Sequence, residues 1–187
     1  MTGQELAAVA TAASTPYVHE VVTACQNSDR SVAVVSNNSA AAVHSYLARH
    51  GLDDRISLVV ARTNHDHALL KPSPYLIIQA VHALNAEPGE CTLLGDSVTD
   101  VQAAHLASVQ SIGYANMPGK RERLNAAGAG AIINSLADLA LTLRAHVINP
   151  ELLQLPPRFF QGRTFGAPRP TGQGRSSRKC AGQTRRA

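Results

Sequence analysis

The amino-acid sequence predicts an α/β fold in which a mostly parallel sheet carries helices on both faces. Short β-branched or apolar runs such as Ser31–Ser36 and Thr92–Gly95 alternate along the chain with segments of helical character. Strands that alternate with helices are joined by right-handed crossovers and therefore pair in parallel. The chain has 187 residues, of which 44% are hydrophobic, enough for one domain of ordinary size.

The amino-terminal half of this body is expected to hold two strands, each followed by a helix. Pro16, after Ser14 and Thr15, is a favourable first helical residue. The β-branched run that ends at Ser36 is typical of a buried strand, and Gly51 is a typical helix terminator. The expected elements are helices over 5–13, 16–26 and 40–50, the last capped by Asn37-Asn38-Ser39, and strands over 31–36 and 56–60.

The carboxyl-terminal half continues the alternation. After a polar loop, Pro72-Ser73-Pro74 opens a helix that reaches about Asn85. An apolar run that ends in Gly95-Asp96 and then turns helical indicates a strand-to-helix junction. The expected elements are strands over 92–95, 109–113 and 131–133 and helices over 72–85, 99–107, 118–127 and 136–145.

The net charge of +4 divides into a mildly acidic body and a strongly basic tail. From Asn149 onward the chain carries eight basic residues and one acidic residue, a charge of +7, which leaves −3 for the remainder. The tail is rich in Gly, Pro, Ser and Arg and lacks apolar periodicity, so we expect residues 149–187 to be disordered. A basic tail can attract nucleic-acid phosphates, but we favour an inert, solvated tail. An aromatic content of 4% also argues against a base-stacking surface.

The sequence predicts a cytoplasmic protein that has no contact with a membrane. No apolar stretch approaches the length of a membrane span. The segment from Met1 to Glu5 lacks the basic and apolar regions of a secretory signal. Cys25, Cys91 and Cys180 are few and unclustered, which is typical of a reducing compartment and of neither a disulfide framework nor a zinc site.

Polar residues that suit a phosphate and a magnesium ion stand at three separate junctions. Ser36 and Asn37 end the first strand, where a hydroxyl and the backbone N–H groups of a helix amino terminus can hold an anion. Lys71 precedes a proline, which fixes the local backbone. Asp96 and Asp100 follow the third strand. Mg²⁺ usually takes one or two protein carboxylates together with substrate phosphate oxygens and water.

Each of these residues also has a plainer interpretation. Ser36 could cap the following helix, and Lys71 could be a solvated loop residue. Asp96 after Gly could form a turn, and Asp100 could favour the helix dipole. The segment His65-Asp66-His67 could bind a metal, but we favour a polar loop there. The combination of the other residues in this order favours the functional interpretation.

The body resembles the haloacid dehalogenase-like hydrolase superfamily, in its phosphoglycolate-phosphatase-like branch. Val32–Asn37 resembles the second motif of that superfamily, Lys71–Pro74 the third and Leu94–Asp100 the fourth. The resemblance covers roughly residues 6–143 and implies a Rossmann-like core. It also implies magnesium-dependent hydrolysis of a small phosphorylated metabolite.

The resemblance assigns a role to each candidate site residue. Ser36 and Asn37 would bind the substrate phosphate. Lys71 would stabilise the nucleophile and the phosphoryl charge. Asp96 would hold the magnesium ion, and Asp100 would support that metal site.

One motif of the superfamily has no counterpart in this sequence. The first motif is an Asp-x-Asp-Gly pattern at the end of the first strand, and its first Asp is the covalent nucleophile. The acidic residues ahead of Ser36 are Glu5 and Glu20, on expected helices, and Asp29, in a turn at the wrong end of the strand. We therefore expect a phosphatase scaffold that is incomplete or inactive as this chain. The alternative is a phosphate- and magnesium-binding pseudoenzyme or fragment that acts by interaction.

The absent motif also removes a strand that is central in the superfamily, between the strands that end at Ser36 and Asp96. The two flanking strands are then expected to pair directly, to accept a strand from a separate partner polypeptide, or to belong to a poorly folding fragment. We divide the chain into a helical remnant of a cap or linker (1–30), a core (31–148) and the tail (149–187). A start at Met1 inside what resembles a linker suggests a truncated reading frame.

Overall fold

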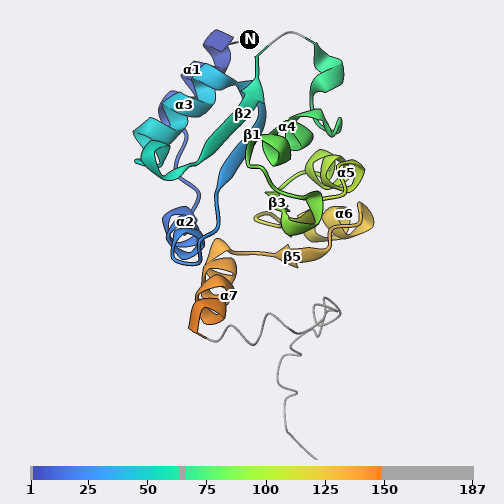
Figure 1. Ribbon diagram of the computed structural model, residues 1–187. Coiled ribbons are helices and arrows are strands. Elements are labelled where there is room, and N and C mark those ends of the chain that lie inside the picture. The colour runs from blue at the N-terminus through green and yellow to red at the C-terminus, as the bar shows by residue number, and fades with distance from the viewer. Residues whose placement is uncertain (1, 64–65, 149–187) are drawn as a thin grey trace, which may run out of the picture.

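Parallel strands and helices alternate along the chain, as predicted, in the computed structural model, which describes residues 2–63 and 66–148 (Figure 1). The strands are β1 (Ala33–Ser39), β2 (Leu58–Arg62), β3 (Thr92–Gly95), β4 (Gln110–Tyr114) and β5 (Ala131–Ile133). β1 pairs in parallel with β2, and β3, β4 and β5 pair in parallel in that order. The expected basic tail lies outside the described residues.

The helices lie within a few residues of their expected positions. They are α1 (Thr2–Thr11), α2 (Val18–Gln26), α3 (Ala40–Arg49), α4 (Tyr75–Ala83), α5 (Val98–Leu106), α6 (Lys120–Ala126) and α7 (Leu136–Ile148). The hydroxyl of Ser39 accepts a hydrogen bond from the backbone N–H of Ala42 at 3.4 Å, so the expected cap of α3 is present. α2 begins at Val18 and not at Pro16, because Tyr17 has a φ of 65°, which is incompatible with a right-handed helix.

The strands form two sheets and not one. β1 is paired only with β2 and β3 only with β4 in the part of the chain that the structure describes, so both are edge strands. Val35 of β1 and Leu93 of β3 nevertheless pack against the same buried cluster on α4, α5 and the turn before β4 (Ile77, Val81, Ala103, Ala104, Ala107 and Val109). The two edge strands thus lie on one helical layer. Direct pairing of the two strands, the first of the three expected outcomes, does not occur.

Helices cover both faces of β1. Val34 packs against a second buried cluster that α2, α3, β2 and Leu52 provide (Val22, Val43, Leu47, Leu52 and Ala61), whereas Val35 faces α4 and α5. Successive side chains of a strand point to opposite faces, so the expectation of helices on both faces is confirmed for this strand. None of the described helices is both long enough and apolar enough to cross a lipid bilayer.

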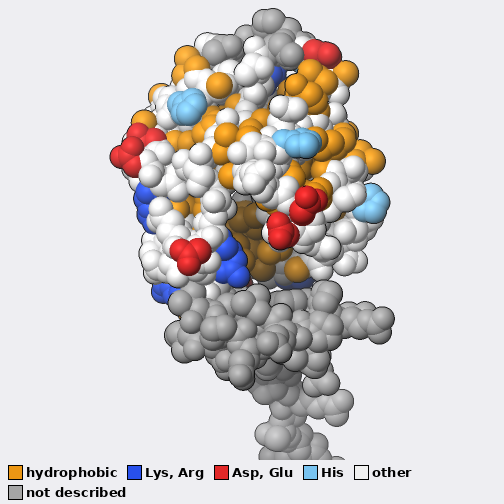
Figure 2. Space-filling model, in the orientation of Figure 1, with side chains coloured by type: hydrophobic (Ala, Val, Ile, Leu, Met, Phe, Trp, Pro, Cys, Tyr) orange, Lys and Arg blue, Asp and Glu red, His pale blue; other side chains and the backbone are white. Residues whose placement is uncertain are grey.

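The division of the sheet leaves apolar surface uncovered. Leu94 of β3 is 36% exposed, although it lies in a strand beside the core residue Leu93. Figure 2 shows a hollow with hydrophobic side chains on its floor, between the surface over α2 and β1 and the surface over β3 and β5. The hollow therefore coincides with the break between the two sheets.

Candidate phosphate and magnesium site

Two of the predicted phosphate ligands, Ser36 and Asn37, lie inside β1, which continues past its expected end at Ser36 to Ser39 but shifts its register with β2 after Ser36. The hydroxyl of Ser36 accepts a hydrogen bond from the backbone N–H of Asn38 at 3.1 Å. The side chain of Asn37 donates to the carbonyl of Lys71 at 3.1 Å and accepts from the N–H of Lys71 at 2.9 Å. Asn37 therefore holds the main chain of Lys71 beside the end of β1, a positioning role that the sequence did not indicate.

Lys71 joins the ends of the two sheets. Its ammonium donates to the carbonyl of Val35 at 3.1 Å and pairs with Oδ1 of Asp100 at 2.6 Å. The two charged side chains are only 13% and 11% exposed. Because the carbonyl of Val35 belongs to the peptide unit that leads into Ser36, the structure brings Lys71 next to Ser36 on one side and next to α5 on the other.

Asp100 is held from both of its carboxylate oxygens. While Oδ1 pairs with Lys71, Oδ2 accepts hydrogen bonds from the N–H of Ser97 at 3.1 Å and from its hydroxyl at 2.7 Å. The Ser97 hydroxyl in turn accepts from the N–H of Asp100 at 3.1 Å, which forms a capping box at the start of α5. The Ser-x-x-Asp spacing was the signal in the sequence that could have predicted this cap.

The charged partner of Asp100 outweighs the effect of burial on its pKa. Burial alone would raise the pKa of this carboxyl, but hydrogen bonds from Lys71 and Ser97 and the charge of Lys71 lower it below the usual value. Asp100 is therefore ionised at neutral pH. Gly95 makes room for it, because a Cβ atom at residue 95 would lie 2.4 Å from the Cβ of Asp100.

Asp96 points toward solvent and has a different cationic partner. Its side chain is 54% exposed, and its Oδ2 pairs at 2.5 Å with the ammonium of Lys120, the first residue of α6. Lys120 lies on another element and has no motif around it, so no pattern in the sequence indicated this contact. Asp96 and Asp100 thus follow the same strand but carry separate lysine partners.

The donor set fits a magnesium ion at Asp96 better than at Asp100. Mg²⁺ needs oxygen ligands and is satisfied by one or two carboxylates together with phosphate and water oxygens. Asp96 can offer an exposed carboxylate, whereas both oxygens of Asp100 are engaged by Lys71 and Ser97. Among residues 2–63 and 66–148, no group of three His, Cys, Asp or Glu side chains is placed to hold a metal. Substrate and water would therefore have to supply most of the ligands.

Glu5 of α1 contacts the segment that leads from Ser36 into α3, which we call the phosphate-binding segment. Glu5 pairs with Arg62 at 2.6 Å and accepts a hydrogen bond from the N–H of Ser39 at 3.0 Å. Arg62, which is buried, also donates to the carbonyl of Asn37 at 3.1 Å. Hydrogen bonds from Ser39, together with Arg62, lower the pKa of Glu5 to about 2. The sequence did not predict this network, because its members lie on three separate elements.

Glu20, Asp29 and Asp66, three other acidic residues considered in the sequence, lie in the helix, the turn and the loop that were predicted for them. Glu20 lies on α2, and Asp29 lies in a turn before β1 with a φ of 54°. The carboxylate of Asp66 accepts a hydrogen bond from the N–H of Ala68 at 2.9 Å and caps the short turn η2 (His67–Leu69), an arrangement typical of a polar loop. His65 lies outside the described residues.

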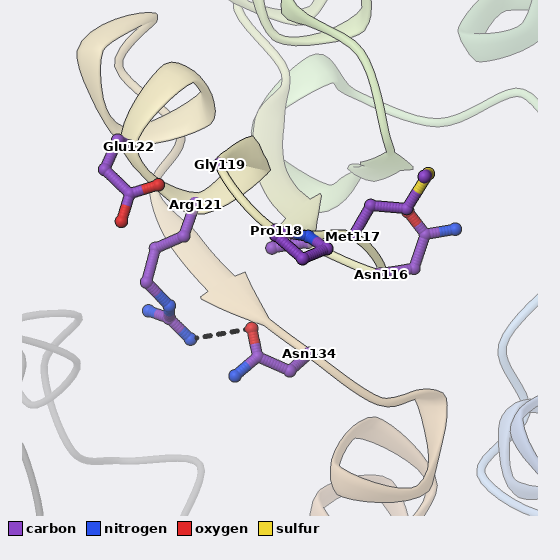
Figure 3. Close-up of a pocket in the computed structure, with 8 residues that line it drawn as sticks. Asn116, Met117, Pro118, Gly119, Arg121, Glu122 and Asn134 are labelled. Atoms are coloured by element: carbon purple, nitrogen blue, oxygen red, sulfur yellow. Dashed lines mark hydrogen bonds between the residues drawn. The ribbon is translucent and has the colours of Figure 1, made fainter.

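A pocket of about 430 Å³ lies beside this site, at the ends of β4 and β5 (Figure 3). Arg121 extends from α6 toward Asn134 and donates a hydrogen bond to its side-chain oxygen at 3.1 Å. The predicted site residues do not line this pocket, although Lys120, the partner of Asp96, immediately precedes Arg121. The remaining lining residues are Ala115, Asn116, Met117, Pro118, Gly119 and Glu122.

Comparison with known proteins identifies the family. Residues 4–114 match the sequence profile of the haloacid dehalogenase-like hydrolases. This chain belongs to that family, and the resemblance predicted from its motifs is confirmed.

Two curated relatives have phosphatase activity in their names. The bifunctional riboflavin kinase/FMN phosphatase of Arabidopsis thaliana is 32% identical over 59% of this chain and 28% of its own length. A plasmid-encoded phosphoglycolate phosphatase of Cupriavidus necator is 30% identical over 68% of this chain and 54% of its own length. The chain therefore spans about half or less of the length of these relatives.

Solved structures share the fold. The crystal structure of CbbY from Rhodobacter sphaeroides in complex with phosphate superposes with a TM-score of 0.63. It is 22% identical, and the match covers 74% of this chain and 62% of the CbbY chain. The α/β architecture inferred from the sequence is therefore that of known haloacid dehalogenase-like hydrolases.

Proposed function

We propose that this chain forms the phosphate- and magnesium-binding part of a hydrolase of small phosphorylated metabolites. The position of Lys71 carries the proposal. Its ammonium lies beside Ser36 at the end of one sheet and contacts Asp100 at the end of the other. In open α/β folds, ligands bind outside the carboxyl ends of the strands. The phosphatase names of the curated relatives support a phosphate ester as the substrate class.

Each residue contributes one interaction in this proposal. The hydroxyl of Ser36 donates to a phosphoryl oxygen, and Lys71 offsets part of the phosphoryl charge. Asn37 keeps Lys71 in place through its two hydrogen bonds to the main chain. Asp96 is the direct metal ligand, and Asp100 acts by holding Lys71. A bound magnesium ion would polarise the phosphoryl oxygens and orient the substrate.

The chain by itself is proposed to bind and not to turn over its substrate. The sequence has no Asp-x-Asp motif, and the family's covalent route needs a free carboxylate nucleophile. Asp100 is not free, because both of its oxygens are engaged. The ion pair between Lys71 and Asp100 therefore favours the second candidate function, a non-catalytic phosphate-binding protein that acts through interactions.

The cysteine pattern, with Cys25 and Cys91 as free thiols, supports a cytoplasmic location.

Turnover of p-nitrophenyl phosphate with magnesium tests this proposal. We expect the wild-type chain and the Asp96→Asn variant to release nitrophenol at the same background rate, while phosphate raises the melting temperature of the wild type. Asp138→Asn, on α7, serves as a charge-matched control. Turnover that Asp96→Asn abolishes and Asp138→Asn retains would show a complete enzyme.

We propose further that a strand from another polypeptide segment fills the break between β1 and β3. Edge strands carry unpaired backbone groups that recruit further strands, and the hollow in Figure 2 offers apolar contacts for its side chains. The test adds, in trans, a polypeptide that carries the family's first motif. Phosphatase turnover that needs both components supports the proposal. Failure of the added polypeptide to bind this chain would refute it.

A further inference from the structure

In the contact between Lys120 and Asp96, the lysine side chain is mostly covered although the carboxylate is exposed. The ammonium of Lys120 lies 2.5 Å from Oδ2 of Asp96, and the lysine side chain is only 18% exposed, whereas Asp96 is 54% exposed. An exposed lysine retains its rotamer freedom and gains little from pairing. Here most of the lysine side chain is covered, so the fold itself brings the ammonium to the carboxylate.

The backbone before Lys120 fixes this placement. Gly119 adopts a left-handed conformation with a φ of 75°, and the N–H of Lys120 bonds to the carbonyl of Met117 at 3.3 Å. This tight turn starts α6 immediately after the segment that leaves β4. Lys120 is thereby aimed across the ends of β4 and β3 at Asp96.

The charges around the two carboxylates are balanced without a metal. Lys71 neutralises Asp100, and Lys120 neutralises Asp96. A magnesium ion held by Asp96 would share that carboxylate with the ammonium of Lys120, which contacts its Oδ2. Because like charges within a few ångströms of each other repel, the ammonium of Lys120 opposes the binding of a divalent cation at Asp96.

We propose that Lys120 is an internal competitor of the metal, and that its ammonium occupies the cation position at Asp96 until a divalent cation displaces it. This inference rests on the proposed function, in which Asp96 is the direct metal ligand. Lys120 is then a residue that sets metal affinity and not a catalytic residue. It also keeps Asp96 neutralised whenever the metal is absent.

Binding of Mn²⁺ to the purified full chain, followed by the loss of the free-ion signal in electron paramagnetic resonance, tests the inference. Lys120→Met keeps the length of the side chain and removes its charge, so we expect Mn²⁺ to bind about ten-fold more tightly than to the wild type at low ionic strength. Lys120→Gln should also increase the affinity for Mn²⁺. Lys120→Arg should leave the affinity within about two-fold, because the charge is retained.

Arg121→Met is the matched control, because it removes one positive charge from the neighbouring residue, whose partner is Asn134 and not Asp96. We expect it to change the affinity by less than about two-fold, since its exposed guanidinium does not contact Asp96 and interacts with it mainly through water of high dielectric constant. Equal affinities for wild type and Lys120→Met would overturn the inference. If the two proteins bind Mn²⁺ equally and Asp96→Asn abolishes this binding, Asp96 is still supported as the metal ligand of the proposed function. Failure of every variant to bind Mn²⁺ would refute both.

Discussion

At the scale of single residues, the site depends on atoms that approach very closely. Gly95 ends β3 against the side chain of Asp100, and Asp100 links Ser97 to Lys71. The hydrogen bonds of Asn37 fix the main chain of Lys71. The phosphate contacts and the start of α5 are therefore coupled, and a small change at residue 95 should disturb both.

Replacing Gly95 tests this close approach. A Cβ atom at residue 95 would lie 2.4 Å from the Cβ of Asp100, so Gly95→Ala should destabilise the fold by about 1–3 kcal/mol, as overpacked sites do. Gly89→Ala is the control, because nothing lies within 4 Å of a Cβ there. Urea unfolding measures both variants. If Gly95→Ala and Gly89→Ala have equal free energies of unfolding, the side chain of Asp100 moves away from residue 95 at no cost, which would contradict the close approach.

The ion pair between Lys71 and Asp100 should stabilise the fold more than the pair between Lys120 and Asp96. The first pair is largely buried, whereas Asp96 is exposed. Double-mutant cycles with Lys→Met and Asp→Asn changes should give a coupling energy of about 2 kcal/mol for the buried pair. The exposed pair should give less than about 1 kcal/mol. The reverse order would contradict the assigned role of Asp100.

At the scale of elements, α1 is attached to the core through a charged network and through α3, whose Arg49 donates a hydrogen bond to the carbonyl of Val9 at 3.3 Å. Glu5 contacts Ser39 and Arg62, and Arg62 holds the carbonyl of Asn37. α1 therefore supports the segment that leads from β1 into α3. The loss of Glu5 should loosen both α1 and the phosphate-binding segment.

The low pKa of Glu5 makes this attachment dependent on pH. Its pKa falls from the ordinary value of 4.5 to about 2 on folding, so its stabilising contribution is complete above about pH 5 and is lost as the pH falls toward 2. Glu5→Gln should lower the melting temperature at pH 7, and the difference from wild type should shrink below pH 4.5. Glu20→Gln, on α2, is the control. A difference that does not vary between pH 7 and pH 2.5 would contradict the assignment.

The sequence predicted the elements well because each has a local signal. The β-branched residues before Ser36 and the Gly95-Asp96 junction identified the strands, and Ser39 identified a cap. The structure also places Lys71 next to Ser36 and in contact with Asp100, while the roles of these residues stay predictions. Contacts such as Glu5–Arg62 depend on how separate elements pack, and no local pattern encodes them.

At the scale of the whole molecule, the break between β1 and β3 is the main structural feature. Val35 and Leu93 share one cluster, yet the strands that carry them do not pair. The chain spans 28% and 54% of the two curated relatives. The proposed strand partner follows from this break.

Amide hydrogen exchange by nuclear magnetic resonance would detect the break directly. In β4, which has a strand on each side, consecutive amides should be protected. In β1 and β3, each with one neighbour, alternate amides should exchange at least about ten-fold faster, because only every second N–H points to that neighbour. Uniform protection along β1 and β3 would show that the break is closed in solution.

Phosphate binding, measured by isothermal titration calorimetry in the presence of magnesium, tests the central claim most directly. The account predicts that orthophosphate binds to the wild-type chain and that Ser36→Ala and Lys71→Met each weaken this binding by about ten-fold, since each removes one hydrogen-bond donor to the anion. Ser73→Ala, on the same loop as Lys71, should leave the affinity unchanged. Binding that is unaffected by Ser36→Ala and Lys71→Met, or no binding at all, would contradict it.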